Sequence, residues 1–217
     1  MRSSIATPVG DLRRIRTLME RSRYFIGLSG LSGIGAGLFA LLGVAAVVAY
    51  QTAAGRPITF IAETLILRGD HPWGIAPLPF LLLTGAVVLL GALACGYYFT
   101  HRRAQRLGHS IDDPRTYKLL FNLALPLAVG GVFCLALVYH AHGGLVGPAT
   151  LVFYGMALVN GSAYASEELN YLGYMEIALG LVACFFIGYG LHFWAVGFGL
   201  LHIGYGWWMY RKYDTHE

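Results

Sequence analysis

The chain has 217 residues, of which 57% are hydrophobic and 12% are charged, and its formal net charge is +4 at pH 7. A soluble globular domain carries about 25% charged residues, so this composition excludes an ordinary soluble protein and predicts an integral membrane protein. The positive charge does not indicate nucleic-acid binding, because the basic residues flank the apolar stretches.

Residues 1–23 form a basic segment ahead of the first apolar stretch. Leu12, Ile15, Leu18 and Met19 recur at helical spacing, with arginines on the opposite face. This pattern predicts an amphipathic helix that lies on the membrane surface with its cations toward anionic lipid headgroups. The alternative is a basic flank that fixes the topology and does nothing more.

Six apolar stretches follow, and each approaches the ~20 residues that cross a hydrocarbon core of ~30 Å. They predict an all-α bundle of six transmembrane helices in a domain of residues 24–210, followed by a tail of residues 211–217. The expected spans lie near 24–50, 77–99, 117–139, 145–165, 169–189 and 191–210.

The distribution of basic residues predicts the orientation of these spans. All of the 15 Lys and Arg residues except Arg56 and Arg68 lie in the N-terminal segment, between the second and third spans, or in the C-terminal tail. Cytoplasmic loops carry the excess of Lys and Arg, so both termini are expected in the cytoplasm.

Small residues recur along two of the predicted helices. Ser29, Gly33 and Gly37 are spaced by four residues in the first span, and Gly197 and Gly204 are spaced by seven in the last. Such stripes let helix backbones approach closely in a bilayer. They predict packing within the chain or, as the alternative, a contact in a homo-oligomer.

Glu176 is the one acidic residue deep inside an apolar stretch, where an ionisable side chain costs roughly 2.5–3.5 kcal/mol to insert. At ~1.5 Å of rise per residue, Glu176 and His202 lie about 10–12 Å from the cytoplasmic ends of their spans. Asn122 and Asn160 come out at a similar level. Because the last two spans form a tight hairpin, Glu176 and His202 are expected to be neighbours within a layer of four polar side chains.

A buried Glu and His pair can exchange a proton near neutral pH, since burial and an opposite charge act against each other. The first functional hypothesis is therefore a small proton-linked transporter or channel, in which the asparagines hydrogen-bond the carboxylate or a polar ligand. The pair can alternatively be a structural clamp between helices. A second hypothesis, from another class, is a non-catalytic sensor or assembly subunit that presents its N-terminal helix to a partner.

Four histidines are expected at the external face: His71, His140, His142 and His192. Imidazole is the commonest metal ligand, so these residues could hold zinc or copper, and His140 with His192 could ligate haem. The alternative is that they are interfacial side chains and that the protein has no cofactor. The sequence contains no HExxH, GxSxG or P-loop motif, so no catalytic residue is predicted and an enzyme is not the favoured class.

Three segments carry a resemblance. They are residues 23–33 (RYFIGLSGLSG), 169–180 (LNYLGYMEIALG) and 193–202 (FWAVGFGLLH). These segments resemble parts of bacterial integral membrane proteins of about six spans that have no assigned activity. The resemblance implies a multi-pass protein of a bacterial inner membrane, and it brings no activity, cofactor or site residue with it.

Overall fold

A computed structural model describes residues 30–55, 72–106 and 114–214 of the chain, and these residues form helices and short turns without any strand. The prediction of an all-α protein is confirmed for this part of the chain. Residues 1–29, which include the predicted surface helix and the start of the first expected span, lie outside the described residues.

Within the described residues, four helices are long and apolar enough to cross a membrane. They are α2 (Gly30–Ala53), α4 (Pro77–Arg106), α5 (Pro114–Tyr139) and α6 (Val146–Ser162), the last preceded by the 3₁₀ turn η2 (Gly143–Leu145). A second 3₁₀ turn, η1 (Pro72–Gly74), precedes α4. Their mean hydropathy and length support the prediction of transmembrane helices in a membrane protein.

The last two expected spans are less regular. Helix α7 (Glu168–Ala183) has 16 residues, which corresponds to ~24 Å, and it ends before the 3₁₀ turn η3 (Ile187–Tyr189). The C-terminal helix is one continuous run made of α8 (Gly190–Trp194), the π-helix η4 (Ala195–Leu201), α9 (His202–Met209) and the π-helical end η5 (Tyr210–Asp214). Helix α7 is therefore shorter than the ~20 residues of a full span, and the C-terminal helix changes helix type along its length.

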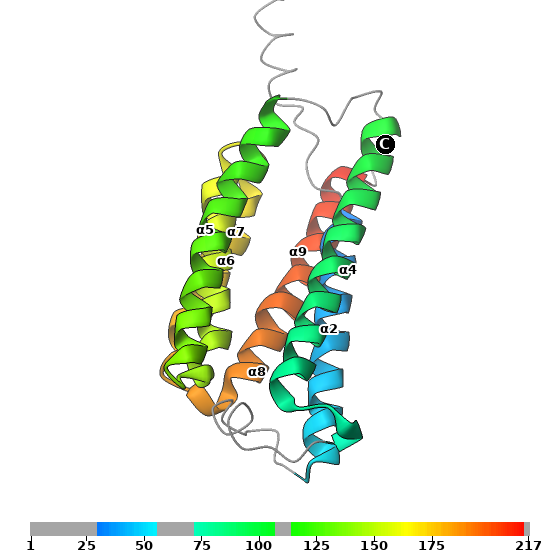
Figure 1. Ribbon diagram of the computed structural model, residues 1–217. Coiled ribbons are helices and arrows are strands. Elements are labelled where there is room, and N and C mark those ends of the chain that lie inside the picture. The colour runs from blue at the N-terminus through cyan, green and yellow to red at the C-terminus, as the bar shows by residue number, and fades with distance from the viewer. Residues whose placement is uncertain (1–29, 56–71, 107–113, 215–217) are drawn as a thin grey trace, which may run out of the picture.

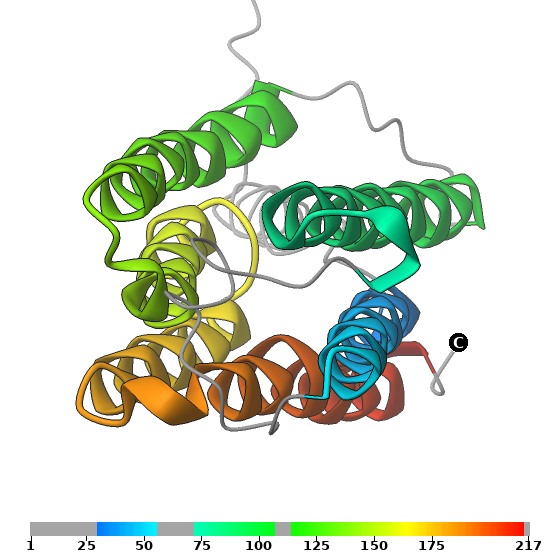
Figure 2. The ribbon, with the colours of Figure 1, turned by 60° about the horizontal axis from the view of Figure 1, so that its bottom comes forward.

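The described helices form two groups (Figure 1). In one group α6 packs against both α5 and α7, and in the other α2 packs against both α4 and the C-terminal helix. The view from below shows the C-terminal helix running from beside α7 to beneath α2, so that it joins the groups (Figure 2). The two groups meet where α6 and α7 contact α8 and η4. We call this contact region the seam.

Glycines set the closest helix approaches. A Cβ atom at Gly155 of α6 would lie 2.6 Å from the carbonyl oxygen of Gly173 of α7. A Cβ atom at Gly33 of α2 would lie 3.1 Å from the Cα atom of Gly206 of α9. Because any larger residue would separate these backbones, Gly33, Gly155, Gly173 and Gly206 lie where two helices of the chain pack closely.

The outward faces of α4 and α5 are apolar and uncovered. Large side chains along both helices are more than half exposed, among them Leu90, Tyr97, Phe121 and Leu135. Apolar exposure on this scale is unusual for a soluble monomer and is typical of a surface that contacts lipid. The arrangement therefore places the buried core inward, along α6, α7 and the C-terminal helix.

Candidate functional site

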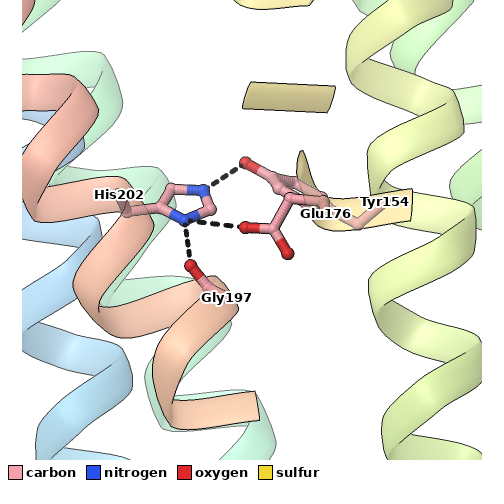
Figure 3. A network of polar contacts seen from close by, with 4 residues as sticks. All are labelled: Tyr154, Glu176, Gly197 and His202. Carbon is pink, nitrogen blue, oxygen red and sulfur yellow. Dashed lines mark hydrogen bonds and ion pairs between the residues drawn. The ribbon is translucent and has the colours of Figure 1, made fainter. Parts of the chain in front are cut away.

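Glu176 lies in the middle of α7 and its side chain is completely buried at the seam, with 0% exposure. Its Oε1 atom is 3.4 Å from Nδ1 of His202, the first residue of α9 (Figure 3). His202 is also buried, at 5% exposure. The two residues that were expected to be neighbours are thus in ion-pair distance, on helices from the two different groups.

His202 makes two further polar contacts. Its Nδ1 atom lies 3.0 Å from the carbonyl oxygen of Gly197, and its Nε2 atom lies 2.8 Å from the hydroxyl of Tyr154 on α6 (Figure 3). A ring that carries its proton on Nδ1 donates to Gly197 and accepts from Tyr154 at Nε2. A doubly protonated ring donates at both atoms, because a tyrosine hydroxyl can also accept. The same geometry therefore suits both charge states of the imidazole.

The carboxyl group of Glu176 has few polar neighbours among the described residues. Neither of its oxygens makes a hydrogen bond within the described part of the chain, and its nearest charged partner is His202. The pair is electrically neutral when it holds one titratable proton, whether that proton sits on the carboxyl group or on the imidazole. Gaining or losing a proton leaves a net charge in a buried place, and a buried uncompensated charge is costly.

Gly197 gives the carboxyl group its space. A Cβ atom at this position would lie 2.5 Å from Oε2 of Glu176 and 2.5 Å from Cδ2 of Leu151. Gly197 belongs to the π-helical segment η4, and π-helical turns inside α-helices are frequent at functional sites. The residue thus serves the site twice, because it admits the carboxyl group and offers its carbonyl oxygen to His202.

Aromatic rings pack on one side of the imidazole of His202. The ring centroid of Phe198 lies 5.9 Å from that of His202 and 5.0 Å from that of Tyr154, and Trp194 packs 4.8 Å from Phe198. These rings form an apolar wall on one side of the polar contacts. They strengthen the electrostatic interactions behind them by keeping the local dielectric constant low.

The two asparagines of the predicted polar layer make their hydrogen bonds with backbone atoms and not with the Glu176 and His202 pair. The amide nitrogen of Asn160 donates to the backbone oxygen of Asn122 at 3.0 Å, and that of Asn122 donates to the oxygen of Lys118 at 2.8 Å. These bonds join α6 to α5 and lie within α5, and Asn160 is exposed. The asparagines therefore do not hydrogen-bond the carboxyl group of Glu176.

The external histidines that the structure describes do not form a cluster that could hold a metal ion. Within residues 30–55, 72–106 and 114–214, no three His, Cys, Asp or Glu side chains come together in a way that could hold a metal ion. The ring of His140 contacts Tyr139, and the ring of His192 contacts Tyr189. His71 lies outside the described residues.

The predicted packing glycines have different surroundings. Gly33 and Gly37 face the C-terminal helix, where a Cβ atom at Gly37 would lie 2.7 Å from the oxygen of Gly199. Gly197 faces the carboxyl group, whereas a Cβ atom at Gly204 would meet nothing within 4 Å. Ser29 lies outside the described residues.

Tyr154 is the site residue that sequence reasoning missed. The sequence feature that could have indicated it is a hydroxyl-bearing side chain in the middle of an apolar run, where a buried tyrosine usually needs a hydrogen-bond partner.

In comparisons with protein-family models, with curated proteins and with solved structures, no match to the chain was found. The contacts among Glu176, His202 and Tyr154 are therefore the basis on which a function can be proposed.

Proposed function

We propose that this chain is a multi-pass membrane protein that moves protons, or a solute together with protons, by means of the Glu176 and His202 pair. The observation that carries the proposal is the completely buried carboxyl group, which makes no hydrogen bond within the described residues and lies 3.4 Å from the imidazole. An ionisable group at membrane depth is costly and is therefore a functional candidate.

The proposal includes the topology expected from the sequence. Six spans are proposed, with both termini in the cytoplasm of a bacterium and residues 1–23 on the inner membrane surface. The arrangement supports six spans, because α7 and the C-terminal helix run alongside α2, α4, α5 and α6 (Figure 1). Charged residues at one end of this pair, Glu168 on α7 and Lys212 on the C-terminal helix, suit a membrane boundary.

The position of the pair at the seam suggests how proton binding is coupled to movement. Glu176 belongs to the group of α5, α6 and α7, whereas His202 belongs to the C-terminal helix that packs on α2. With one shared proton the two side chains attract or are both neutral, and the seam is closed. A second proton, or the loss of the first, leaves a net charge that must be hydrated or paired, and this requirement favours opening of the seam.

Tyr154 is proposed to orient the imidazole. Its hydroxyl fixes the Nε2 side of the ring, so that Nδ1 remains directed at Glu176 and the oxygen of Gly197. Since a hydroxyl can reverse from donor to acceptor, the contact survives a change in the charge of the ring. Tyr154 is in this way a positioning residue and not the proton carrier.

The test is proton flux in liposomes. Purified protein is reconstituted with an internal pH-sensitive dye, a pH gradient is imposed, and the initial rate is measured for the wild type and Glu176→Gln. We expect pH-dependent flux in the wild type and its loss in the variant. The matched control is Glu167→Gln, which removes an exposed carboxylate near the start of the same helix and should leave the rate unchanged.

Two results would overturn the proposal: a wild-type protein with no pH-dependent flux, or a Glu176→Gln variant with the full rate. If the Glu176 and His202 pair is only a structural clamp between helices, Glu176→Gln will change thermal stability and leave flux unaltered. His202→Gln, measured in parallel, should abolish flux as well, since it removes the other member of the pair.

A further inference from the structure

A groove runs between α7 and the C-terminal helix on the side of the seam. It encloses about 240 Å³, and six of the residues that line it are Tyr171, Met175, Leu200, Gly204, Tyr205 and Trp208. Gly204 keeps the groove open, because a Cβ atom there would contact nothing within 4 Å. Its lining is almost wholly apolar, with the polar tips of the aromatic residues as the exception.

The shape and chemistry of the groove select its occupant. A volume of 240 Å³ lies below the ~300–1,000 Å³ of a typical small-molecule site, so a slender molecule fits best. The lining offers no charged side chain. Between two helices of a bilayer protein, the slender apolar molecule at hand is the acyl chain of a membrane lipid.

The groove is slightly shorter than one leaflet. From Leu200 to Trp208, the first and last lining residues on the C-terminal helix, the rise is ~12 Å at ~1.5 Å per residue. Half of a ~30 Å hydrocarbon core is ~15 Å. An acyl chain in the groove therefore extends from the middle of the bilayer at Leu200 to the headgroup level near Trp208 and Lys212.

Two exposed cations stand at the headgroup end. The guanidinium of Arg211 lies 5.9 Å from the ring centroid of Trp207, and the ammonium of Lys212 lies 5.6 Å from that of Trp208, which lines the groove. Lys212 also forms an ion pair with Glu168, and its side chain remains 45% exposed, so that a headgroup can reach the ammonium from outside. Such side chains attract anionic headgroups, by about 1 kcal/mol for each cation near the surface, which corresponds to about a fivefold change in binding.

We propose that this groove binds one acyl chain of an anionic phospholipid, whose phosphate is held at Arg211 and Lys212. The bound chain would fill the space between two helices whose neighbouring residues form the proton site, since Met175 adjoins Glu176. The lipid thereby helps to fix the distance between α7 and the C-terminal helix. This inference depends on insertion of the chain into a bilayer and not on proton movement.

The experiment measures retained lipid. The full chain is purified in a mild detergent, phosphatidylglycerol or phosphatidylcholine is titrated, and bound lipid is counted by native mass spectrometry. We expect preferential retention of phosphatidylglycerol by the wild type. Gly204→Leu, which fills the groove, should lose the retained lipid. Gly131→Leu, at an equally open position on α5, should keep it.

The headgroup contacts are tested separately. Arg211→Gln and Lys212→Gln should each weaken the binding of phosphatidylglycerol about fivefold and leave phosphatidylcholine unchanged. The proposal is overturned if Gly204→Leu retains phosphatidylglycerol as well as the wild type, or if the wild type retains both lipids equally.

A second measurement needs no variant in the groove. Quenching of tryptophan fluorescence in the wild type by brominated phosphatidylglycerol should exceed that by brominated phosphatidylcholine at equal content, because Trp208 lines the groove. Equal quenching by the two lipids would also overturn the proposal. Neither readout involves proton flux, so failure here is distinguishable from failure of the transport proposal.

Discussion

The carboxyl group of Glu176 lies where a side chain at Gly197 would be: a Cβ atom on the glycine would lie 2.5 Å from Oε2 of the carboxyl group. The contact couples the shape of the π-helical segment to the position of the buried acid. The addition of one methyl group at Gly197 should therefore disturb the site.

Gly197→Ala should displace the carboxyl group from His202 and reduce flux. Forcing a methyl group into a packed interior costs about 1–3 kcal/mol, so the free energy of unfolding should fall by that amount. Chemical denaturation in detergent and the liposome assay measure the two effects. Gly204→Ala, in the same helix but with open space around it, should change neither. Equal behaviour of the two variants would show that the contact with Glu176 has no role.

Tyr154→Phe should shift the pH dependence of flux and leave the fold intact. The change removes the hydroxyl that lies 2.8 Å from Nε2 of His202 and keeps the ring against Phe198. Loss of one buried hydrogen bond costs about 1 kcal/mol. The measurement is the pH profile of flux, with Tyr174→Phe as a control because Tyr174 is exposed on α7. A profile that coincides with that of the wild type would remove Tyr154 from the site.

The sequence was sufficient to predict the helical class and the meeting of Glu176 with His202. Composition and run length favour membrane helices, and four such helices are present among the described residues. The tight hairpin between the last two expected spans and the matched depth of Glu176 and His202 indicated that they are neighbours, and Oε1 of Glu176 lies 3.4 Å from Nδ1 of His202. The number of six spans stays a prediction.

The composition of the polar layer could not be predicted from depth alone. Counting residues inward assumes that all helices begin at one level, but α6 ends at Ser162, before the expected boundary at residue 165. Asn160 consequently lies near the end of α6, whereas Tyr154, farther inward, reaches His202. The π-helical segment Ala195–Leu201 was not predicted either, because the hairpin was read from apolar run length, which does not distinguish helix types.

Glu168 ties α7 to the end of the C-terminal helix. Its Oε1 atom accepts hydrogen bonds from Nζ of Lys212 at 2.5 Å and from the hydroxyl of Tyr213 at 2.6 Å. Partial burial by itself would raise the pKa of Glu168, but the bonds from Lys212 and Tyr213 outweigh it and lower this pKa from 4.5 to about 2. The folded protein therefore binds a proton at Glu168 less readily than the unfolded chain does.

This difference sets the pH window of a stability effect. A carboxyl group with a lowered pKa stabilises the fold at pH values above 4.5, and the effect is lost as the pH falls through about 2. Glu168→Gln should therefore lower the melting temperature at pH 7, and the difference from the wild type should vanish near pH 2. Thermal unfolding in detergent across this range is the measurement, with Glu167→Gln as the control. A difference that persists at pH 2 would contradict the electrostatic cause.

Gly206→Val should separate the C-terminal helix from α2. A Cβ atom at Gly206 would lie 2.6 Å from both the oxygen of Gly30 and the nitrogen of Ile34. These are backbone atoms, which cannot rotate away as a side chain can, so the loss of stability should reach about 3 kcal/mol. Gly96→Val, at an open position of α4, should be tolerated. Denaturation and light scattering distinguish two cases: if Gly206 served a contact between copies of the chain, Gly206→Val would change the molar mass and leave the stability of one chain unaltered.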